Sequence, residues 1–203
     1  ALYMVGLVPL LLFPALRRGI VETKRWNDHS QGLVASRGVG EAISAAFAPI
    51  AELYRLHPRR ALALGLLGGL SAAGTGVAFQ FISEFLQTER GWTPGTFAAL
   101  SISFGAFGIV GNPVAARLGD RIGRRAIAAV VLVLFPLCAF GFYAGPASLV
   151  ALPWTAMVFL SMASSVTTRA LATELFPTAL RGTGGGSLAL LETLGVAAGL
   201  FAY

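Results

Sequence analysis

The feature that most constrains the fold is a series of long apolar stretches that recur between short charged segments. A helix needs about 20 apolar residues to cross the hydrocarbon core of a bilayer. We expect five such helices, at residues 61–83, 96–116, 126–144, 149–168 and 183–203, and a partial one at 1–16. With 56% hydrophobic and 12% charged residues, the chain has more apolar surface than one soluble core can bury. The sequence therefore predicts an all-α, polytopic transmembrane helix bundle.

Residues 17–60 form a polar segment that is too charged to cross a membrane. Within it, apolar residues recur every three or four positions from Gly40 to Leu56, which is the pattern of an amphipathic helix. We expect a cytoplasmic linker whose helix lies along the membrane surface.

Positive charges are distributed unequally between alternate loops. All but one of the 15 Lys and Arg residues lie in segments 17–60, 117–125 and 169–182, and the exception is Arg90. Because cytoplasmic loops carry the excess of Lys and Arg, we expect these three segments in the cytoplasm. The protein is then expected in the cell membrane, and in a bacterium in the inner membrane.

Two charged segments between apolar stretches point to a family. Residues 116–125 read Ala-Arg-Leu-Gly-Asp-Arg-Ile-Gly-Arg-Arg, in which Gly123 permits a tight reversal and the charged groups can form strong hydrogen bonds with a neighbouring helix. This segment resembles the G-x-x-x-D-R-x-G-R-R loop of major facilitator transporters, with Ala116 in place of the first Gly. Residues 174–184 resemble the E-x-x-P-x-x-x-R-G-T-G loop of the sugar porter and metabolite:proton symporter branches. Residues 21–26 are a weaker match to a third segment, P-E-S-P-R-W.

The resemblance implies that the chain corresponds to the sixth to eleventh helices of a twelve-helix fold. The chain would then be the C-terminal half of a carrier, with the N-terminal half missing. The resemblance also implies a cytoplasmic gate, in which Asp120 meets the positive start of the last helix and an arginine pairs with Glu174. The gate residues would be Asp120, Arg121, Gly123, Arg124, Arg125, Glu174, Pro177, Arg181 and Gly182. The alternative is that the arginines only anchor solvated loops on the positive side.

Three polar residues inside or beside the apolar stretches are candidates for proton coupling or substrate binding. Glu192 is the strongest, because an ionisable group near the middle of a bilayer is costly and is usually functional. Arg169 and Gln80 could contact a polar solute, although Arg169 could also extend to the membrane surface. For each residue the alternative is a purely structural role.

Several function classes find no support in the sequence. The basic residues form no continuous face for nucleic acid, and His29 and His57 are isolated, so no metal site is expected. The Gly-rich segment after Arg181 lacks the Gly-Lys-Ser/Thr ending of a phosphate loop. We expect no cofactor and no enzymatic activity.

The expected function is therefore secondary transport of a small-molecule substrate across the lipid bilayer, with protons as the coupling ion. Sugar-porter motifs expected in the seventh and tenth helices are absent, which favours an organic acid or a similar metabolite over a hexose. The alternatives are a facilitative or efflux carrier of the same fold and a membrane sensor that has lost transport.

Overall fold

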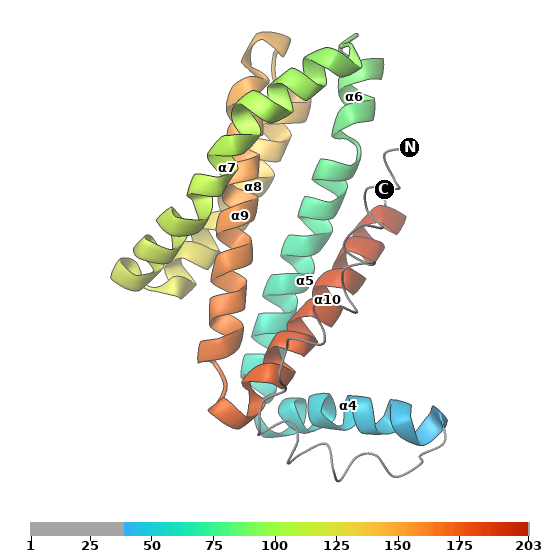
Figure 1. Cartoon of the computed structure of the whole chain (residues 1–203), viewed down its shortest axis with the longest axis vertical. Coiled ribbons are helices and arrows are strands. Elements are labelled where there is room, and N and C mark those ends of the chain that lie inside the picture. Colours follow the sequence, from blue (N-terminus) through green and yellow to red (C-terminus); the bar gives the residue numbers. More distant parts are fainter. Residues whose placement is uncertain (1–38, 203) are drawn as a thin grey trace, which may run out of the picture. The chain divides into compact units, whose positions relative to one another are not determined.

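The computed structural model describes residues 39–202 (Figure 1). The partial helix expected at 1–16 and the first part of the linker, up to residue 38, lie outside the described residues. The chain divides into two units, Ala1–Ala46 and Phe47–Tyr203. The second unit contains the apolar helices.

The described chain consists of seven α-helices and two short 3₁₀ turns, which confirms the all-α prediction. The helices are α4 Val39–Leu56, α5 Pro58–Gln80, α6 Ile82–Thr88, α7 Pro94–Ile122, α8 Arg124–Ala144, α9 Ala151–Glu174 and α10 Arg181–Ala202, and the turns are Ala147–Leu149 and Thr178–Leu180. By length and hydropathy, four segments within residues 39–202 could cross a membrane: Pro58–Thr88, Pro94–Ile122, Arg124–Ala144 and Thr178–Ala202.

The fifth expected span corresponds to α9, which is 24 residues long but is not among the four by hydropathy. Its hydroxyl groups donate to carbonyls of its own preceding turn, for example Thr155 to Ala151 at 2.7 Å and Thr167 to Ala163 at 2.7 Å. Polar side chains satisfied in this way are tolerated within a membrane. Moreover, α9 packs against α7, α8 and α10, so neighbouring helices cover much of its surface. A central helix can therefore be less apolar than those around it.

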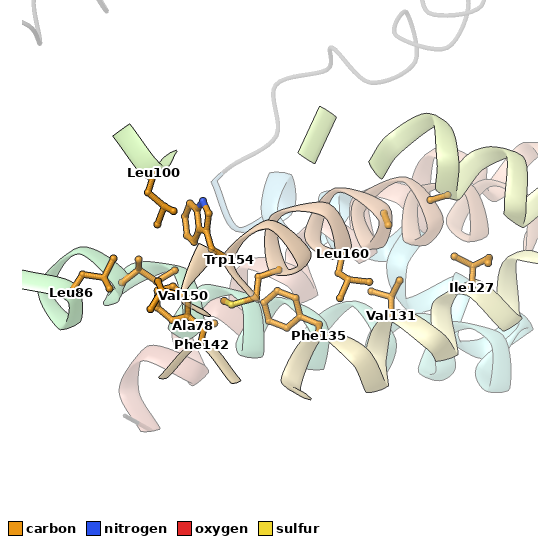
Figure 2. Packing of buried hydrophobic residues seen from close by; sticks show 14 residues of the cluster. Ala78, Leu86, Leu100, Ile127, Val131, Phe135, Phe142, Val150, Trp154 and Leu160 are labelled. Carbon is orange, nitrogen blue, oxygen red and sulfur yellow. The ribbon is translucent and has the colours of Figure 1, made fainter. Parts of the chain in front are cut away.

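The interior is divided into two hydrophobic clusters. The larger one joins α5, α6, α7, α8 and α9 and includes Leu86, Phe142 and Met157, whose side chains are fully buried. Figure 2 shows Phe142, Phe135 and Trp154 of this cluster close to one another. The smaller cluster joins α4, α5, α8, α9 and α10. Helix packing at both ends of the bundle thus depends on α9.

Glycines set the closest helix contacts. A Cβ atom at Gly195 of α10 would collide with the carbonyl of Gly69 in α5, and one at Gly199 would lie 2.7 Å from the carbonyl of Ala73. The helices α7 and α9 meet in the same way at Gly111. Small residues allow backbones to approach closely where lipid provides no hydrophobic drive for association.

Candidate functional site

The junction between α7 and α8 is a single residue. The sequence predicted a charged turn over 117–125, but α7 continues through Asp120 and Arg121 to Ile122, and α8 begins at Arg124. Only Gly123 lies between them, with a φ of 96° that L side chains rarely adopt. The prediction was wrong about the length of the turn because charge does not end a helix, whereas a left-handed glycine does. The expected role of Gly123 in the reversal agrees with this geometry.

Arg124 links the ends of three helices. Its Nη2 atom donates to Asp120 Oδ1 of α7 at 3.1 Å, and its Nε atom lies 3.0 Å from Glu174 Oε1 at the end of α9. The Arg124 side chain is 32% exposed, while Asp120 and Glu174 are more open to solvent. We refer to Arg124, Asp120 and Glu174 as the charge cluster. Both ion pairs are accessible to water, so they can break and reform at low energetic cost.

Other residues of the expected gate are placed around this cluster without ion pairs. The structure pairs Asp120 with Arg124 rather than with the start of α10, because the single-residue break at Gly123 keeps the last turn of α7 close to the first residue of α8. Within residues 39–202, no carboxylate lies within ion-pair distance of Arg121, Arg125 or Arg181. Pro177 and Gly182 are exposed and flank the 3₁₀ turn that leads into α10.

Two contacts at this end were not predicted from the sequence. Arg60 Nη1 donates to the Leu175 carbonyl at 3.0 Å, and so caps the end of α9 from the start of α5. Phe176 is buried against Gly184 of α10. The sequence signal for Arg60 was only its place at the start of an apolar stretch, which also fits a simple membrane anchor.

Glu192 lies on the face of α10 that meets α5. Its side chain is partly buried, and a Cβ atom at Gly68 would be 3.5 Å from Glu192 Cγ. Gly68 therefore leaves room beside the carboxylate. Across the described part of the chain, no hydrogen bond or ion pair to Glu192 is present. The residue is about 16 Å from the start of α10, at 1.5 Å per residue.

Arg169 and Gln80 lie apart from Glu192 on other helices. Arg169 is exposed on α9, and its Nε atom is 3.4 Å from Ser165 Oγ. Gln80 is exposed and is the last residue of α5, because the helix breaks at Phe81 before α6 begins. Gln80 therefore belongs to α5 and Glu84, four residues later, to α6. No contact in the structure brings the three candidates together.

A large cavity lies at the opposite end of the bundle, away from the charge cluster. Its volume is about 910 Å³, and it lies between α5, α6 and α8. Its lining includes Glu84, Glu89, Phe85 and Tyr143. None of the three coupling candidates lines this cavity. Beside it, Arg90 donates to the carbonyls of Tyr143 and Gly145 at 3.1 and 2.6 Å, and its guanidinium lies over the Phe85 ring.

Two further cavities lie at the charged end. One of about 660 Å³ surrounds the charge cluster, and one of about 440 Å³ lies between the starts of α5 and α8 beside the end of α9. Residues 39–202 contain no cluster of three or more side chains that could hold a metal ion. The end of the bundle that carries the charge cluster therefore combines two ion pairs, two cavities and the helix break at Gly123.

Comparisons with known proteins bear on the family of the chain. No curated protein and no solved structure matches the chain. The family model of the Major Facilitator Superfamily matches residues 1–200. Together with the apolar helices, this match confirms a multi-pass membrane protein with a transport function. The chain belongs to the Major Facilitator Superfamily of membrane transporters.

Proposed function

We propose that this chain is part of a secondary active transporter that carries a small organic metabolite, an organic acid foremost, together with protons. The chain supplies the sixth to eleventh helices of a carrier of the sugar porter or metabolite:proton symporter type. A preceding half of the same protein supplies the other wall of the substrate cavity. Transport proceeds by alternating access, in which two halves of a carrier rock around a central site.

The observation that carries this proposal is the position of Arg124 between Asp120 and Glu174. One guanidinium joins the end of α7, the start of α8 and the end of α9. While both pairs are formed, these three helix ends stay together and the charged end of the carrier is shut. Because the pairs are solvent-accessible and weak, substrate binding can supply the free energy that opens them.

Glu192 supports the proton-coupled form of the proposal. Its carboxylate is partly buried between two membrane helices and has no cationic partner in the described chain, and an ionisable group inside a membrane span is usually functional. In this proposal Glu192 carries the coupled proton at the contact between α10 and α5. Because Gly68 has no side chain, Glu192 can lie directly at the contact between α5 and α10. A change in its charge there would affect how the two helices pack.

The charge distribution favours an anionic metabolite over a cation near Arg169. Arg169 is exposed, and within residues 39–202 its side chain has one hydrogen-bond contact, to Ser165 Oγ at 3.4 Å, so its guanidinium is available to a carboxylate. The large cavity at the other end carries Glu84 and Glu89, which would repel an organic acid. We therefore place the substrate on the Arg169 side of the bundle. The protein is proposed to lie in the cell membrane, with segments 17–60, 117–125 and 169–182 in the cytoplasm.

The test is uptake of a panel of radiolabelled organic acids, sugars and amino acids into proteoliposomes that contain the full-length carrier. Wild type, Glu192→Gln and the matched control Glu84→Gln are compared with and without an imposed proton gradient. We expect gradient-driven uptake of an organic acid that Glu192→Gln reduces at least about tenfold and Glu84→Gln leaves nearly intact. Uptake that ignores both the gradient and Glu192→Gln would indicate a facilitative carrier and would remove Glu192 from the coupling mechanism. Absence of uptake for every compound would favour a sensor.

A further inference from the structure

We propose that the 440 Å³ cavity between the starts of α5 and α8 binds an anionic phospholipid. The phosphate headgroup lies among Arg59, Arg60 and Arg125, and the first part of an acyl chain lies on the apolar floor below them. No residue of the charge cluster lines this cavity and neither does Glu192, although the cavity shares Arg125, Leu171 and Leu175 with the cavity around the cluster. Lipid binding goes beyond the proposed transport function.

The shape of the cavity fits an amphiphile. Its three arginines belong to the first turns of α5 and α8, which begin at the same end of the bundle. Beyond them both helices contribute only apolar side chains to the lining, including Leu67 of α5 and Leu132 of α8. From Arg60 to Leu67 the floor extends about 10 Å along α5, at 1.5 Å per residue. A charged mouth above an apolar floor of this length matches a lipid headgroup and the upper part of its chain.

The charge at the mouth is unbalanced. Arg59, Arg60 and Arg125 are exposed, and no carboxylate within residues 39–202 lies within ion-pair distance of any of them. One guanidinium nitrogen of Arg60 is occupied by the Leu175 carbonyl, which fixes that side chain at the cavity. Asp120, five residues before Arg125, and Glu174 at the end of α9 are paired with Arg124, while Glu52 of α4 is exposed and makes no ion pair with these arginines.

Both helix starts increase this positive potential. A helix N-terminus carries a partial positive charge, so acidic residues are favoured there and arginines are not. Neither α5 nor α8 has an acidic residue in its first turn or a side-chain cap. Two neighbouring helices thus carry arginines in their first turns, where acidic residues would be favoured, at the same cavity. This is expected where a bound anion completes the site.

A phospholipid fits better than a soluble anion because the floor of the cavity offers no polar partner. Arginine binds phosphate oxygens through paired hydrogen bonds. Basic pockets between membrane helices hold anionic headgroups, and each Arg near the membrane surface contributes to the attraction. A soluble phosphate would use the mouth and leave the floor unoccupied.

The experiment is native mass spectrometry of the purified, delipidated protein in detergent, titrated with phosphatidylglycerol or with phosphatidylcholine of the same acyl chains. We compare wild type, the triple variant Arg59→Gln/Arg60→Gln/Arg125→Gln, and a control triple variant Arg55→Gln/Arg117→Gln/Arg121→Gln. The control loses the same charge outside the cavity. We expect phosphatidylglycerol to bind about tenfold more tightly than phosphatidylcholine to wild type and to the control. In the cavity variant this preference disappears.

A second variant tests the floor without changing the charge. Ala129 lines the cavity and is exposed, so Ala129→Trp fills the apolar part with little effect on folding. We expect it to weaken phosphatidylglycerol binding several-fold, and we expect millimolar glycerol 3-phosphate not to displace the lipid. Equal binding of the two lipids to wild type, or equal loss in the control triple variant, would overturn the proposal. Displacement by glycerol 3-phosphate together with an unaffected Ala129→Trp would show a soluble-anion site instead. None of these readouts depends on transport.

Discussion

The two ends of the helix bundle are built in contrasting ways. At the end formed by α6, the start of α7 and the end of α8, aromatic rings pack together and Arg90 is fixed by two carbonyls and the Phe85 ring. At the other end, one glycine separates α7 from α8, and a half-buried arginine joins the helix ends through ion pairs with two exposed carboxylates. Burial makes the first end stable, whereas solvent-exposed charge makes the second end easy to rearrange. In a carrier, the aromatic end would act as the fixed point and the charged end as the moving part.

The largest expected loss of stability comes from the aromatic end. Phe142 is fully buried among Phe85, Tyr143 and Trp154, so Phe142→Ala should lower the free energy of unfolding by about 3–5 kcal/mol. Phe140 is 73% exposed two residues earlier in the same helix and provides the matched control. Thermal unfolding in detergent, followed by circular dichroism, should show a large shift for Phe142→Ala and a small one for Phe140→Ala. Similar shifts for both would mean that this end is not a packed core.

A smaller loss is expected at Arg90. Replacing it in Arg90→Gln removes the charged donor to the Tyr143 and Gly145 carbonyls, which should cost about 2–3 kcal/mol. The control Arg117→Gln removes an exposed arginine for which the structure shows no ion pair in residues 39–202. The same unfolding measurement should separate the two variants. If Arg117→Gln destabilises as much, net charge and not the local contact determines the result.

At the charged end, Gly123 should be the residue most sensitive to backbone strain. Because its φ is 96°, Gly123→Ala should cost about 1–3 kcal/mol. Gly186 in α10 has open space around its Cα atom and ordinary helical geometry, so Gly186→Ala should be neutral or slightly stabilising. A comparison of the two unfolding midpoints tests the strain directly. Equal midpoints would mean that α7 and α8 can join without a left-handed residue.

The smallest effect on stability is expected at the ion pairs themselves. Arg124→Gln breaks two solvent-accessible pairs and should change the free energy of unfolding by about 1 kcal/mol or less. Raising the salt concentration should reduce the difference between wild type and this variant. A loss as large as that of Phe142→Ala would show that the charge cluster is structural and would remove the contrast between the two ends.

The helices and the sharp break at Gly123 could be predicted because apolar length and glycine geometry are local properties of the sequence. The continuation of α7 through Asp120 could not, since charged residues are compatible with either a helix or a turn. The contact of Arg60 with Leu175 joins positions that are 115 residues apart, so only packing reveals it. The break at Phe81 also escapes a hydropathy pattern, because the apolar stretch continues across it.

For the site, the sequence indicated that an arginine of the charged segment would pair with Glu174 but left open which one. The choice of Arg124 follows from Gly123, which turns α8 so that its first residue lies near the end of α9. The large cavity beside α6 was not predicted, because Glu84 and Glu89 have the sequence pattern of a short polar loop. Both residues line this cavity only because α6 packs near α8, which the sequence does not reveal.

The most direct test of the account is a charge exchange across the cluster, measured as gradient-driven uptake by the full-length carrier in proteoliposomes. The variants are Arg124→Glu, Glu174→Arg and the double variant that carries both changes. We predict that each single change reduces the initial rate at least about tenfold, and that the double variant recovers a substantial part of the rate at unchanged protein abundance. Single variants that transport normally, or a double variant no better than either one, would contradict the claim that the Arg124–Glu174 pair controls the transport cycle.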